Sequence, residues 1–342
     1  MYTIIDYIYF YKDRSLSEVK WNTADNLICS ILCYLPCNSF EGKKSLKDLY
    51  EATLNYEPEH NSITMTFKAV EVLKEIIDCK RYKNMTVSRF ECIRNNETQF
   101  GAMTFRIDDI TVVAYEGTDS SLIGWIENAR LFYSYPTYTQ TLAAEYLKKT
   151  LKFWGDNRVY VVGHSKGGNL AMAAAMECSN GIFNKIKSVI NFDGPGFRYE
   201  QFISDKYKRM SQKLINIIPT GSMVGSLLEN EDYMVIKSYE KGWSQHYTTT
   251  WLMFGDNFIP SKASHLSEEL HKSTTVNVRN LDRAVLEETF ETLFKKLGDD
   301  YARDFKIRAE DLFNMYRGLQ HTDPKIRKNI EMILDALLKS FR

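Results

Sequence analysis

The chain has 342 residues, of which 44% are hydrophobic and 26% are charged, and its formal net charge is zero. This length suits one large domain with additions or two domains, and such a hydrophobic fraction is enough for a sizeable core. The balanced charge, without a basic segment interleaved with aromatic residues, argues against a nucleic-acid-binding surface.

The sequence also indicates where the protein resides. No run approaches the ~20 apolar residues that cross a bilayer. Residues 1–15 are apolar, but Asp6 interrupts them, and they lack a basic region and a small-residue cleavage site. We therefore expect mature protein in the cytoplasm. The six cysteines agree with this location, because their spacing shows no disulfide framework and no C-x-x-C pair.

Three cysteines, Cys29, Cys33 and Cys37, recur every four residues and would form a stripe on one helix. No histidine stands near them in the sequence, so we interpret them as small buried apolar residues and not as zinc ligands. We expect neither a metal nor an organic cofactor.

The first part of the chain is predicted to be helical. Asn22-Thr23-Ala24-Asp25 offers capping side chains, apolar residues follow at helical spacing, and Pro36 ends the pattern. No catalytic pattern appears here, so we expect residues 1–87 to pack against a sheet or to shape a substrate cleft. The predicted helices cover residues 1–35, Ser45–Leu54 and Thr66–Cys79.

From residue 88 onward the apolar pattern changes to that of strands. Two turns, at 95–97 and 108–109, predict an antiparallel start, after which strands alternate with the helices Thr139–Phe153 and Lys166–Cys178. This alternation predicts a mainly parallel central sheet covered on both faces. The predicted strands are Ser88–Arg94, Phe100–Ile107, Ile110–Tyr115, Val159–Val162, Ile186–Phe192, Leu214–Ile218 and Tyr233–Ser238.

Residues 277–342 are predicted to form a helical C-terminal extension. Apolar residues at spacings of three and four alternate with charges, which we interpret as solvated faces. With a boundary near Val276, we expect a main domain over residues 1–276 and an extension over 277–342. The predicted helices are Leu281–Leu297, Tyr301–Leu319 and Pro324–Phe341.

One segment organises the chemistry. Gly163-His164-Ser165-Lys166-Gly167 fits the G-x-S-x-G pattern and stands between a predicted strand and a predicted helix. This context places a serine at a sharp, strained turn with its hydroxyl projecting from the sheet edge, where glycines avoid collisions. The backbone N–H of Lys166, at the helix N-terminus, would point at a developing oxyanion. We predict Ser165 as the nucleophile; the alternative is a plain turn with an exposed serine.

A serine nucleophile needs a histidine base. The histidines stand at positions 60, 164, 246, 265, 271 and 321. His60 precedes the serine, the side chain of His164 points away from the serine oxygen, and His321 falls in the C-terminal helices. Of the other three, His246 follows the last predicted strand through a short loop. We predict His246 as the base; the alternative is a surface loop histidine.

The base in turn needs an acid. Asp193 ends an apolar strand, at the carboxyl edge of the sheet where ligands bind. We predict Asp193 as the acid, although a turn-capping role is the alternative. Glu229, Glu231 and Asp232, which come after the next strand, remain as other candidates.

A second oxyanion donor should come from the loop after an earlier strand. Thr118 stands in the loop that follows the strand Ile110–Tyr115, and Gly117 lets the backbone approach a substrate. We predict Thr118 as this donor; an ordinary strand-ending turn is the alternative.

Several segments resemble known hydrolases. Ala114–Thr118 followed by Ser121 and Trp125 resembles the F-R-G-S/T … S … W segment of class 3 (fungal-type) lipases, and Val161–Ala171 resembles their G-H-S-L-G-G-x-L-A segment. The fuller pattern, over roughly residues 1–300, resembles the bacterial Mbeg1-like (DUF2974) branch of that superfamily. The segments that carry it are 22–26, 192–197, 219–225 and Gln245-His246.

The resemblance implies an α/β-hydrolase fold and a serine hydrolase with the triad Ser165, Asp193 and His246. Three departures stand out. Glu116 replaces the arginine of the lipase segment, and Lys166 replaces the usual leucine after the nucleophile. Class 3 lipases carry the acid after the strand that here leads into residues 219–222, where no carboxylate stands; Asp193 lies one strand earlier, as in pancreatic-type lipases.

These observations predict hydrolysis of a carboxylic ester, of an acyl lipid or another hydrophobic substrate, with Trp125 and His164 assigned to substrate binding. The aromatic and aliphatic segment Leu122–Tyr135 is either a mobile lid or a fixed amphipathic helix. A thioesterase, acyltransferase or peptidase of the same mechanism, and a non-catalytic binding protein of this fold, remain alternatives. The expected partner is a small-molecule or lipid ester, with peripheral membrane contact left open; the sequence does not indicate an oligomeric state.

Overall fold

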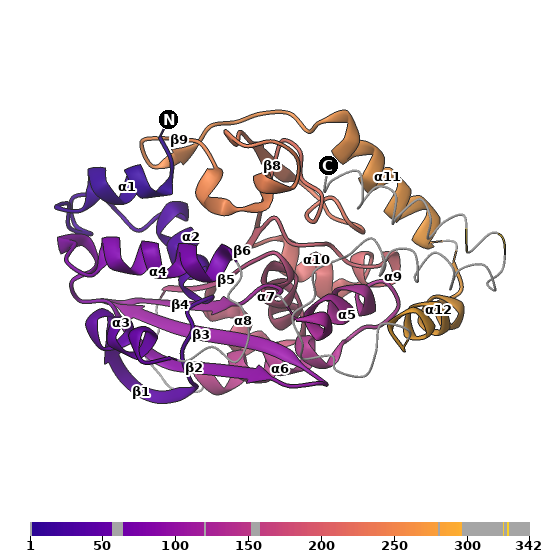
Figure 1. The fold of residues 1–342 in the computed structure, drawn as a ribbon, viewed down its shortest axis with the longest axis horizontal. Coiled ribbons are helices and arrows are strands. Elements are labelled where there is room, and N and C mark those ends of the chain that lie inside the picture. Colours follow the sequence, from indigo (N-terminus) through magenta and orange to yellow (C-terminus); the bar gives the residue numbers. More distant parts are fainter. Residues whose placement is uncertain are drawn as a thin grey trace.

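An eight-stranded sheet, with its strands in sequence order, runs through the protein (Figure 1). The computed structural model describes residues 2–56, 64–119, 121–151, 158–279 and 281–295, together with Pro324 and Arg327. Strands β1 to β4 pair antiparallel, and β4 to β8 pair parallel. The strands are β1 (Phe40–Ser45), β2 (Thr86–Arg94), β3 (Gln99–Ile107), β4 (Ile110–Tyr115), β5 (Arg158–His164), β6 (Ile186–Phe192), β7 (Leu214–Pro219) and β8 (Tyr233–Ile236).

Helices cover both faces of this sheet. Along β4, Val112 and Ala114 join one apolar core whereas Val113 and Tyr115 join the other, as the two-residue period of a strand requires. This is the predicted α/β-hydrolase architecture, so the fold-class prediction is confirmed. The first face carries α1 (Ile4–Tyr11), α2 (Thr23–Leu32), α3 (Leu46–Leu54) and α4 (Thr64–Ile76); the second carries α6 (Tyr138–Thr150), α7 (Lys166–Glu177), α8 (Asn180–Lys185) and α10 (Asp205–Ser211).

A third apolar cluster lies where β4 and the following parallel strands end. It joins α5 (Leu122–Arg130), α11 (His265–Arg279) and α12 (Arg283–Lys295) to the loop that contains Met223 and Leu228. Figure 1 shows these three helices in the right half of the view, away from α1, α3 and α4. This cluster therefore borders the edge of the sheet where the predicted site residues stand.

A buried ion pair fixes the N-terminal helices to one another. The Asp25 carboxylate accepts hydrogen bonds from Arg81 at 2.8 and 2.6 Å and from the Tyr82 hydroxyl at 2.7 Å. Both charged side chains are at most 1% exposed. The predicted cap is also present, because the Asn22 side chain accepts from the N–H groups of Ala24 and Asp25.

The structure departs from the sequence predictions in the N-terminal part. Residues 1–35 hold two separate helices, and α2 ends at Leu32, before Pro36. Cys29, Cys33 and Cys37 are all buried, as expected, but α2 carries only the first of them. Strand β1 was not predicted, because its residues are mostly exposed and polar, as on many edge strands.

The C-terminal part is described only as far as Lys295, apart from two single residues. Helix α12 confirms the predicted helix at Leu281–Leu297, and α11, which was not predicted, contains Val276. The division into two domains stays a prediction. The helices predicted at Tyr301–Leu319 and Pro324–Phe341 lie outside the described residues, apart from Pro324 and Arg327, and so do His60 and His321.

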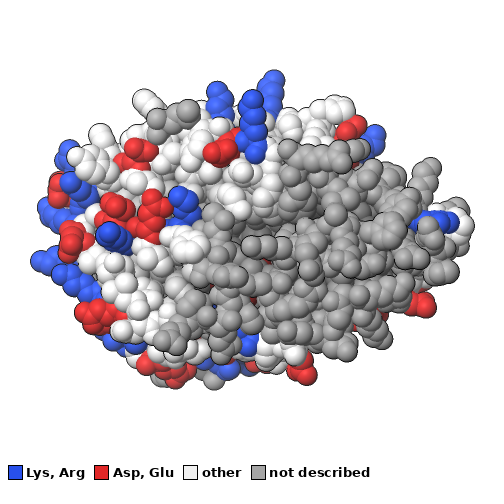
Figure 2. Space-filling view, viewed as in Figure 1, with Lys and Arg blue, Asp and Glu red and all other residues white. Residues whose placement is uncertain are grey.

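Two further properties concern the charge distribution on the surface and the length and polarity of the helices. On the face shown in Figure 2, basic and acidic residues are interspersed over the described part of the surface, which agrees with the zero net charge. Within the described ranges, no helix is long and apolar enough to cross a bilayer.

Candidate active site

Ser165 stands in the tight turn between β5 and α7. Its backbone has φ 58° and ψ −134°, a conformation that residues other than glycine rarely adopt. A Cβ atom on Gly163 would come within 2.1 Å of the Gly167 oxygen, and one on Gly167 within 2.1 Å of the Tyr115 oxygen. Both glycines are therefore required by the close approach of backbone atoms, as the sequence pattern predicts.

Asp193 lies beside this turn. The parallel register of β5 and β6 places His164 opposite Phe192, and the Ser165 N–H donates to the Phe192 oxygen at 3.0 Å. Asp193 follows Phe192, is fully buried, and has φ 52°, a left-handed conformation that aspartate tolerates better than most residues. The strand register thus brings Ser165 and Asp193 to neighbouring positions at one edge of the sheet.

His246 contacts Asp193 directly. It ends the short 3₁₀ helix η2 (Gly242–His246), and its Nδ1 lies 2.7 Å from Asp193 Oδ2. Asp193 Oδ1 accepts from the Ser222 hydroxyl and from the Gly225 N–H, the latter at 3.1 Å. Because a carboxylate only accepts hydrogen bonds, we assign the imidazole proton to Nδ1, which leaves the Nε2 lone pair available.

Ser165 and His246 are not joined by a hydrogen bond in the part of the chain that the structure describes. Among the described residues, neither Ser165 Oγ nor His246 Nε2 has a hydrogen-bond partner. Hydrogen bonds of this kind are often long in sites without substrate and tighten on binding. The role of His246 as the base for Ser165 therefore stays a prediction, whereas a carboxylate at the Nδ1 of His246 is present.

The other candidate acids and bases have different partners. Glu229 pairs with Arg279, whereas Glu231 and Asp232 are exposed. On α11, the exposed His265 lies 3.5 Å from Glu269, and His271 Nδ1 lies 3.2 Å from the Ser226 oxygen. Of the alternatives that the sequence leaves open, Asp193 and His246 are the pair that the structure brings together.

His164 does not occupy the place predicted for it. It is 1% exposed, so the assignment to substrate binding does not fit its environment. The Tyr34 hydroxyl lies 2.9 Å from His164 Nδ1, and His164 Nε2 lies 2.9 Å from the His246 carbonyl oxygen. Burial and the neighbouring His246 hold the pKa of His164 well below its usual range, so the ring is neutral. His164 therefore supports the backbone of His246.

The loop after β4 packs against Ser165. A Cβ atom on Gly117 would come within 2.9 Å of Ser165 Cβ and 2.0 Å of the Tyr34 hydroxyl, so only glycine fits there. Thr118 follows, and Asn128 donates to its Oγ1 at 2.6 Å. Among the described residues, the N–H groups of Thr118 and Lys166 have no hydrogen-bond partner. Their role as oxyanion donors stays a prediction.

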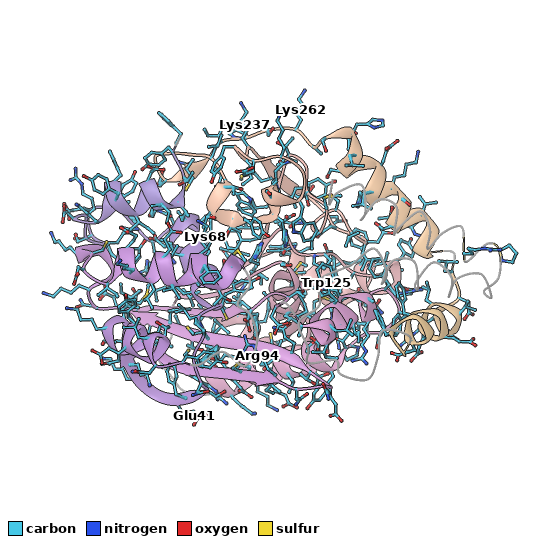
Figure 3. All side chains as sticks on the ribbon, viewed as in Figure 1. Glu41, Lys68, Arg94, Trp125, Lys237 and Lys262 are labelled. Carbon is cyan, nitrogen blue, oxygen red and sulfur yellow. The ribbon has the colours of Figure 1, made fainter. Side chains whose placement is uncertain are left out.

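Glu116 forms a buried ion pair with Arg94. It is 2% exposed, and its Oε1 lies 2.6 Å from Arg94, the last residue of β2, which Figure 3 labels. Burial raises the pKa of Glu116 to about 7, whereas the charges of Arg94 and Lys166 oppose the rise. The guanidinium of Arg94 therefore offsets the negative charge of Glu116, the carboxylate that departs from the lipase pattern.

The Lys166 side chain is buried beneath the same site. Its Nζ lies 2.5 Å from Glu127 Oε2 and 2.7 Å from the Gln99 carbonyl oxygen, and the two charged side chains are 1% and 4% exposed. Burial raises the pKa of Glu127, and the Lys166 ammonium opposes that rise. The residue after the predicted nucleophile is thus tied to helix α5.

An aromatic wall adjoins the imidazole. Trp125 on α5, labelled in Figure 3, is partly buried, and its ring centroid lies 6.3 Å from that of Trp243. Trp243 in turn lies 5.2 Å from the His246 ring. Trp125 was predicted to bind substrate, and its place near His246 agrees with that role, which stays a prediction. Trp243 was not singled out, although it stands three residues before His246.

Other residues that support the site were also missed. Ser222 and Gly225 belong to the segment 219–225 that carries part of the resemblance, so that segment offered a signal for their importance. For Tyr34, which reaches the site from the end of the N-terminal helical region, the sequence offers no pattern. In the part of the chain that the structure describes, no three His, Cys, Asp or Glu side chains come together as metal ligands.

Comparisons with known proteins place this chain among its relatives. The crystal structure of M37 lipase is similar with a TM-score of 0.37 and 15% sequence identity, over 59% of this chain and 67% of that chain. No curated protein matches the sequence. The model of the Mbeg1-like family matches residues 76–295, well over half of the chain. The chain therefore belongs to the Mbeg1-like family.

Proposed function

We propose that this protein is a serine hydrolase that cleaves the carboxylic ester of an acyl lipid or another hydrophobic substrate. Ser165 is the nucleophile, His246 the base and Asp193 the acid. One observation carries the proposal: Ser165 has the backbone of a strained turn, its N–H donates to the residue before Asp193, and the buried Asp193 carboxylate lies 2.7 Å from His246 Nδ1. A strained turn that presents a serine next to such a pair is typical of this chemistry.

The reaction would proceed in two halves. Ser165 Oγ attacks the ester carbonyl carbon while His246 Nε2 accepts its proton, and the tetrahedral intermediate collapses as His246 protonates the departing alcohol. A water molecule then attacks the acyl-enzyme, giving its proton to His246. The second collapse releases the carboxylic acid and returns the proton to Ser165.

The oxyanion of both intermediates needs hydrogen-bond donors. The N–H groups of Lys166 and Thr118 supply them, and one such donor is typically worth ~3 kcal/mol. A negative charge at Glu116 would oppose this stabilisation if it were not compensated. Arg94, 2.6 Å from the Glu116 carboxylate, provides that compensation. The main objection to catalysis, the charge reversal at position 116, is thereby weakened.

The hydrophobic class of substrate follows from the surroundings of the imidazole. Trp243 adjoins His246, Trp125 lies against Trp243, and both pack against the apolar cluster of α5, α11 and α12. Such a wall favours an apolar acyl or alcohol group over a charged one. A thioesterase, an acyltransferase or a peptidase would use the same three residues, but no contact in the site favours them over an ester hydrolase.

The proposal is tested by labelling the protein with a fluorophosphonate and mapping the modified peptide. We expect the label on Ser165, and loss of both labelling and short acyl ester turnover in Ser165→Ala, since losing such a nucleophile can cost ~10⁶ in turnover. Ser30→Ala is the control, because Ser30 is also buried but its hydroxyl donates to the Leu27 oxygen. Labelling of another serine, or a wild type that neither labels nor turns over, would favour the non-catalytic alternative.

A further inference from the structure

Two adjacent residues of α5 hold the two residues that carry the proposed oxyanion donors. Glu127 binds the Lys166 side chain, and Asn128 binds the Thr118 side chain. We infer that α5 is not a mobile lid but a fixed positioning element, in which Glu127 and Asn128 set the distance between the two donors. The positioning role rests on the proposed function, whereas the fixed state of α5 does not.

The first attachment is a buried ion pair. Lys166 Nζ lies 2.5 Å from Glu127 Oε2, and Glu127 Oε1 also accepts from the Gln99 N–H at 3.2 Å. Lifting α5 would separate the two charges and leave the Lys166 ammonium with only the oxygens of Gln99 as partners, in a region where both charged side chains are at most 4% exposed. Separating such a pair is strongly unfavourable, because neither charge regains enough solvent to offset the loss.

The second attachment joins α5 to the loop that precedes it. Asn128 donates to Thr118 Oγ1 at 2.6 Å. The helix begins at a cap in which the Ser121 side chain accepts from the Gly124 N–H, and the Ser121 N–H donates to Asp119 at 2.9 Å. The loop and the helix that follows it therefore move as one unit, and Thr118 moves with them.

The apolar face of α5 is covered as well. Leu122, Ile123 and Ile126 are each at most 2% exposed and join the third apolar cluster. Their neighbours there include Leu270 on α11 and Phe290 on α12. A lid that opens needs a face that can be uncovered at little cost, whereas α5 is held by charges beneath it and by helices beside it.

This arrangement explains why a lysine can follow the predicted nucleophile. A leucine after the nucleophile would supply the same backbone N–H but no link to α5. The lysine side chain reaches Glu127, so a buried ion pair connects the first residue of α7 to the middle of α5. Misplacing a catalytic group by about 1 Å can cost about 100-fold in rate, so a rigid link between the two donors has a direct catalytic consequence.

Two measurements on Glu127→Gln and Asn128→Ala test the inference. The first is amide hydrogen exchange along α5, which needs no substrate. We expect slow exchange in the wild type and exchange that is about tenfold faster or more in Glu127→Gln. Arg130→Gln is the control on the same helix, because Arg130 pairs with Glu291 on α12 at 3.8 Å. Asp25→Asn, which disrupts the other buried ion pair, controls for general destabilisation.

The second measurement is the affinity for a short-chain trifluoromethyl ketone, which forms a hemiketal oxyanion on the nucleophile. We expect each variant to weaken inhibitor binding and to lower kcat by a similar factor, about tenfold to 100-fold, with KM within about threefold. The two control variants should keep the wild-type inhibitor affinity. A merely structural role would lower the melting temperature without moving this affinity.

Different results would contradict the fixed state of α5, its positioning role and the proposed function. Wild-type α5 amides that exchange as fast as an unprotected loop would overturn the inference in favour of a mobile lid. Unchanged inhibitor affinity in both variants of an active enzyme would overturn the positioning role. A wild type without labelling or turnover would overturn the proposed function, and hydrogen exchange would still decide whether α5 is fixed.

Discussion

Replacing Glu116 by glutamine removes a carboxylate that is 2% exposed and stands two residues before Thr118. Burial raises the pKa of this carboxyl from 4.5 to about 7, although the Arg94 guanidinium, 2.6 Å away, opposes the rise. The folded protein therefore holds the Glu116 proton more tightly than the unfolded chain does.

The sign of the resulting pH dependence follows from this difference. A carboxyl whose pKa is raised by folding contributes stability that is fully present below its unfolded pKa of 4.5 and is lost as the pH rises through about 7. Each pH unit in that window corresponds to ~1.4 kcal/mol, so ionisation of Glu116 should lower the free energy of unfolding by about 3 kcal/mol. Glutamine does not titrate, so the Glu116→Gln variant lacks this decline.

The measurement is urea unfolding of the wild type and the variant between about pH 4 and about pH 8. Subtracting one free energy of unfolding from the other cancels the titration of the remaining groups. We expect the wild type to lose about 3 kcal/mol relative to the variant over this range. A constant difference, or one that grows in favour of the wild type as the pH rises, would refute the reasoning, because Arg94 would then outweigh burial.

Two further observations complete this test. The variant should keep kcat on a short acyl ester within about tenfold, or ~1.4 kcal/mol, because Arg94 already compensates the carboxylate that is removed. Glu41→Gln is the matched control. Glu41 also faces an arginine of a neighbouring strand, Arg89, at 3.2 Å, but its side chain is 76% exposed. The Glu41→Gln variant should therefore have a free energy of unfolding whose pH dependence is close to that of the wild type.

Three other changes have defined outcomes. Asp193→Asn should lower kcat about 10³- to 10⁴-fold in a folded protein, because the amide disfavours the required His246 tautomer; steady-state kinetics on a short acyl ester measure this. Trp243→Ala should lower kcat/KM for long acyl esters about tenfold more than for short ones, since its ring lies beside His246; a chain-length series that falls in parallel would contradict this. Arg81→Met should lower the free energy of unfolding by about 3–5 kcal/mol in urea, because it leaves Asp25 buried and unpaired; a loss below ~1 kcal/mol would show that the tyrosine hydroxyls satisfy Asp25 alone.

The central part of the fold could be predicted because its signals are local. Strand β6 begins and ends where the apolar run Ile186–Phe192 does, and the glycines on either side of Ser165 occupy positions where no Cβ atom fits. The order of the parallel strands then places Asp193 beside Ser165. Each step depends on periodicity or on backbone geometry, which a single sequence records.

The contacts that support the site could not be predicted, because they join residues far apart in the chain without a repeating pattern. Tyr34 reaches His164 across 130 positions, and Lys166 reaches Gln99 across 67. Ser222 contacts Asp193 from the loop where class 3 lipases carry the acid itself. This loop has no carboxylate, but it still donates a hydrogen bond to the acid Asp193. The sequence showed that the carboxylate is missing, but not that Ser222 binds Asp193.

Two of the departures from the lipase pattern are related through charge. Glu116 stands two residues before Thr118, Lys166 follows Ser165, both are buried, and each has a partner of opposite sign, Arg94 or Glu127. When Glu116 is ionised, the two pairs together carry no net charge. This balance gives the Glu127→Gln experiment a second use. Removing the Glu127 charge leaves the Lys166 ammonium uncompensated, and electrostatics alone would then stabilise the oxyanion and raise kcat. Positioning by α5 requires the opposite result, a lower kcat, so the sign of the change separates the two effects.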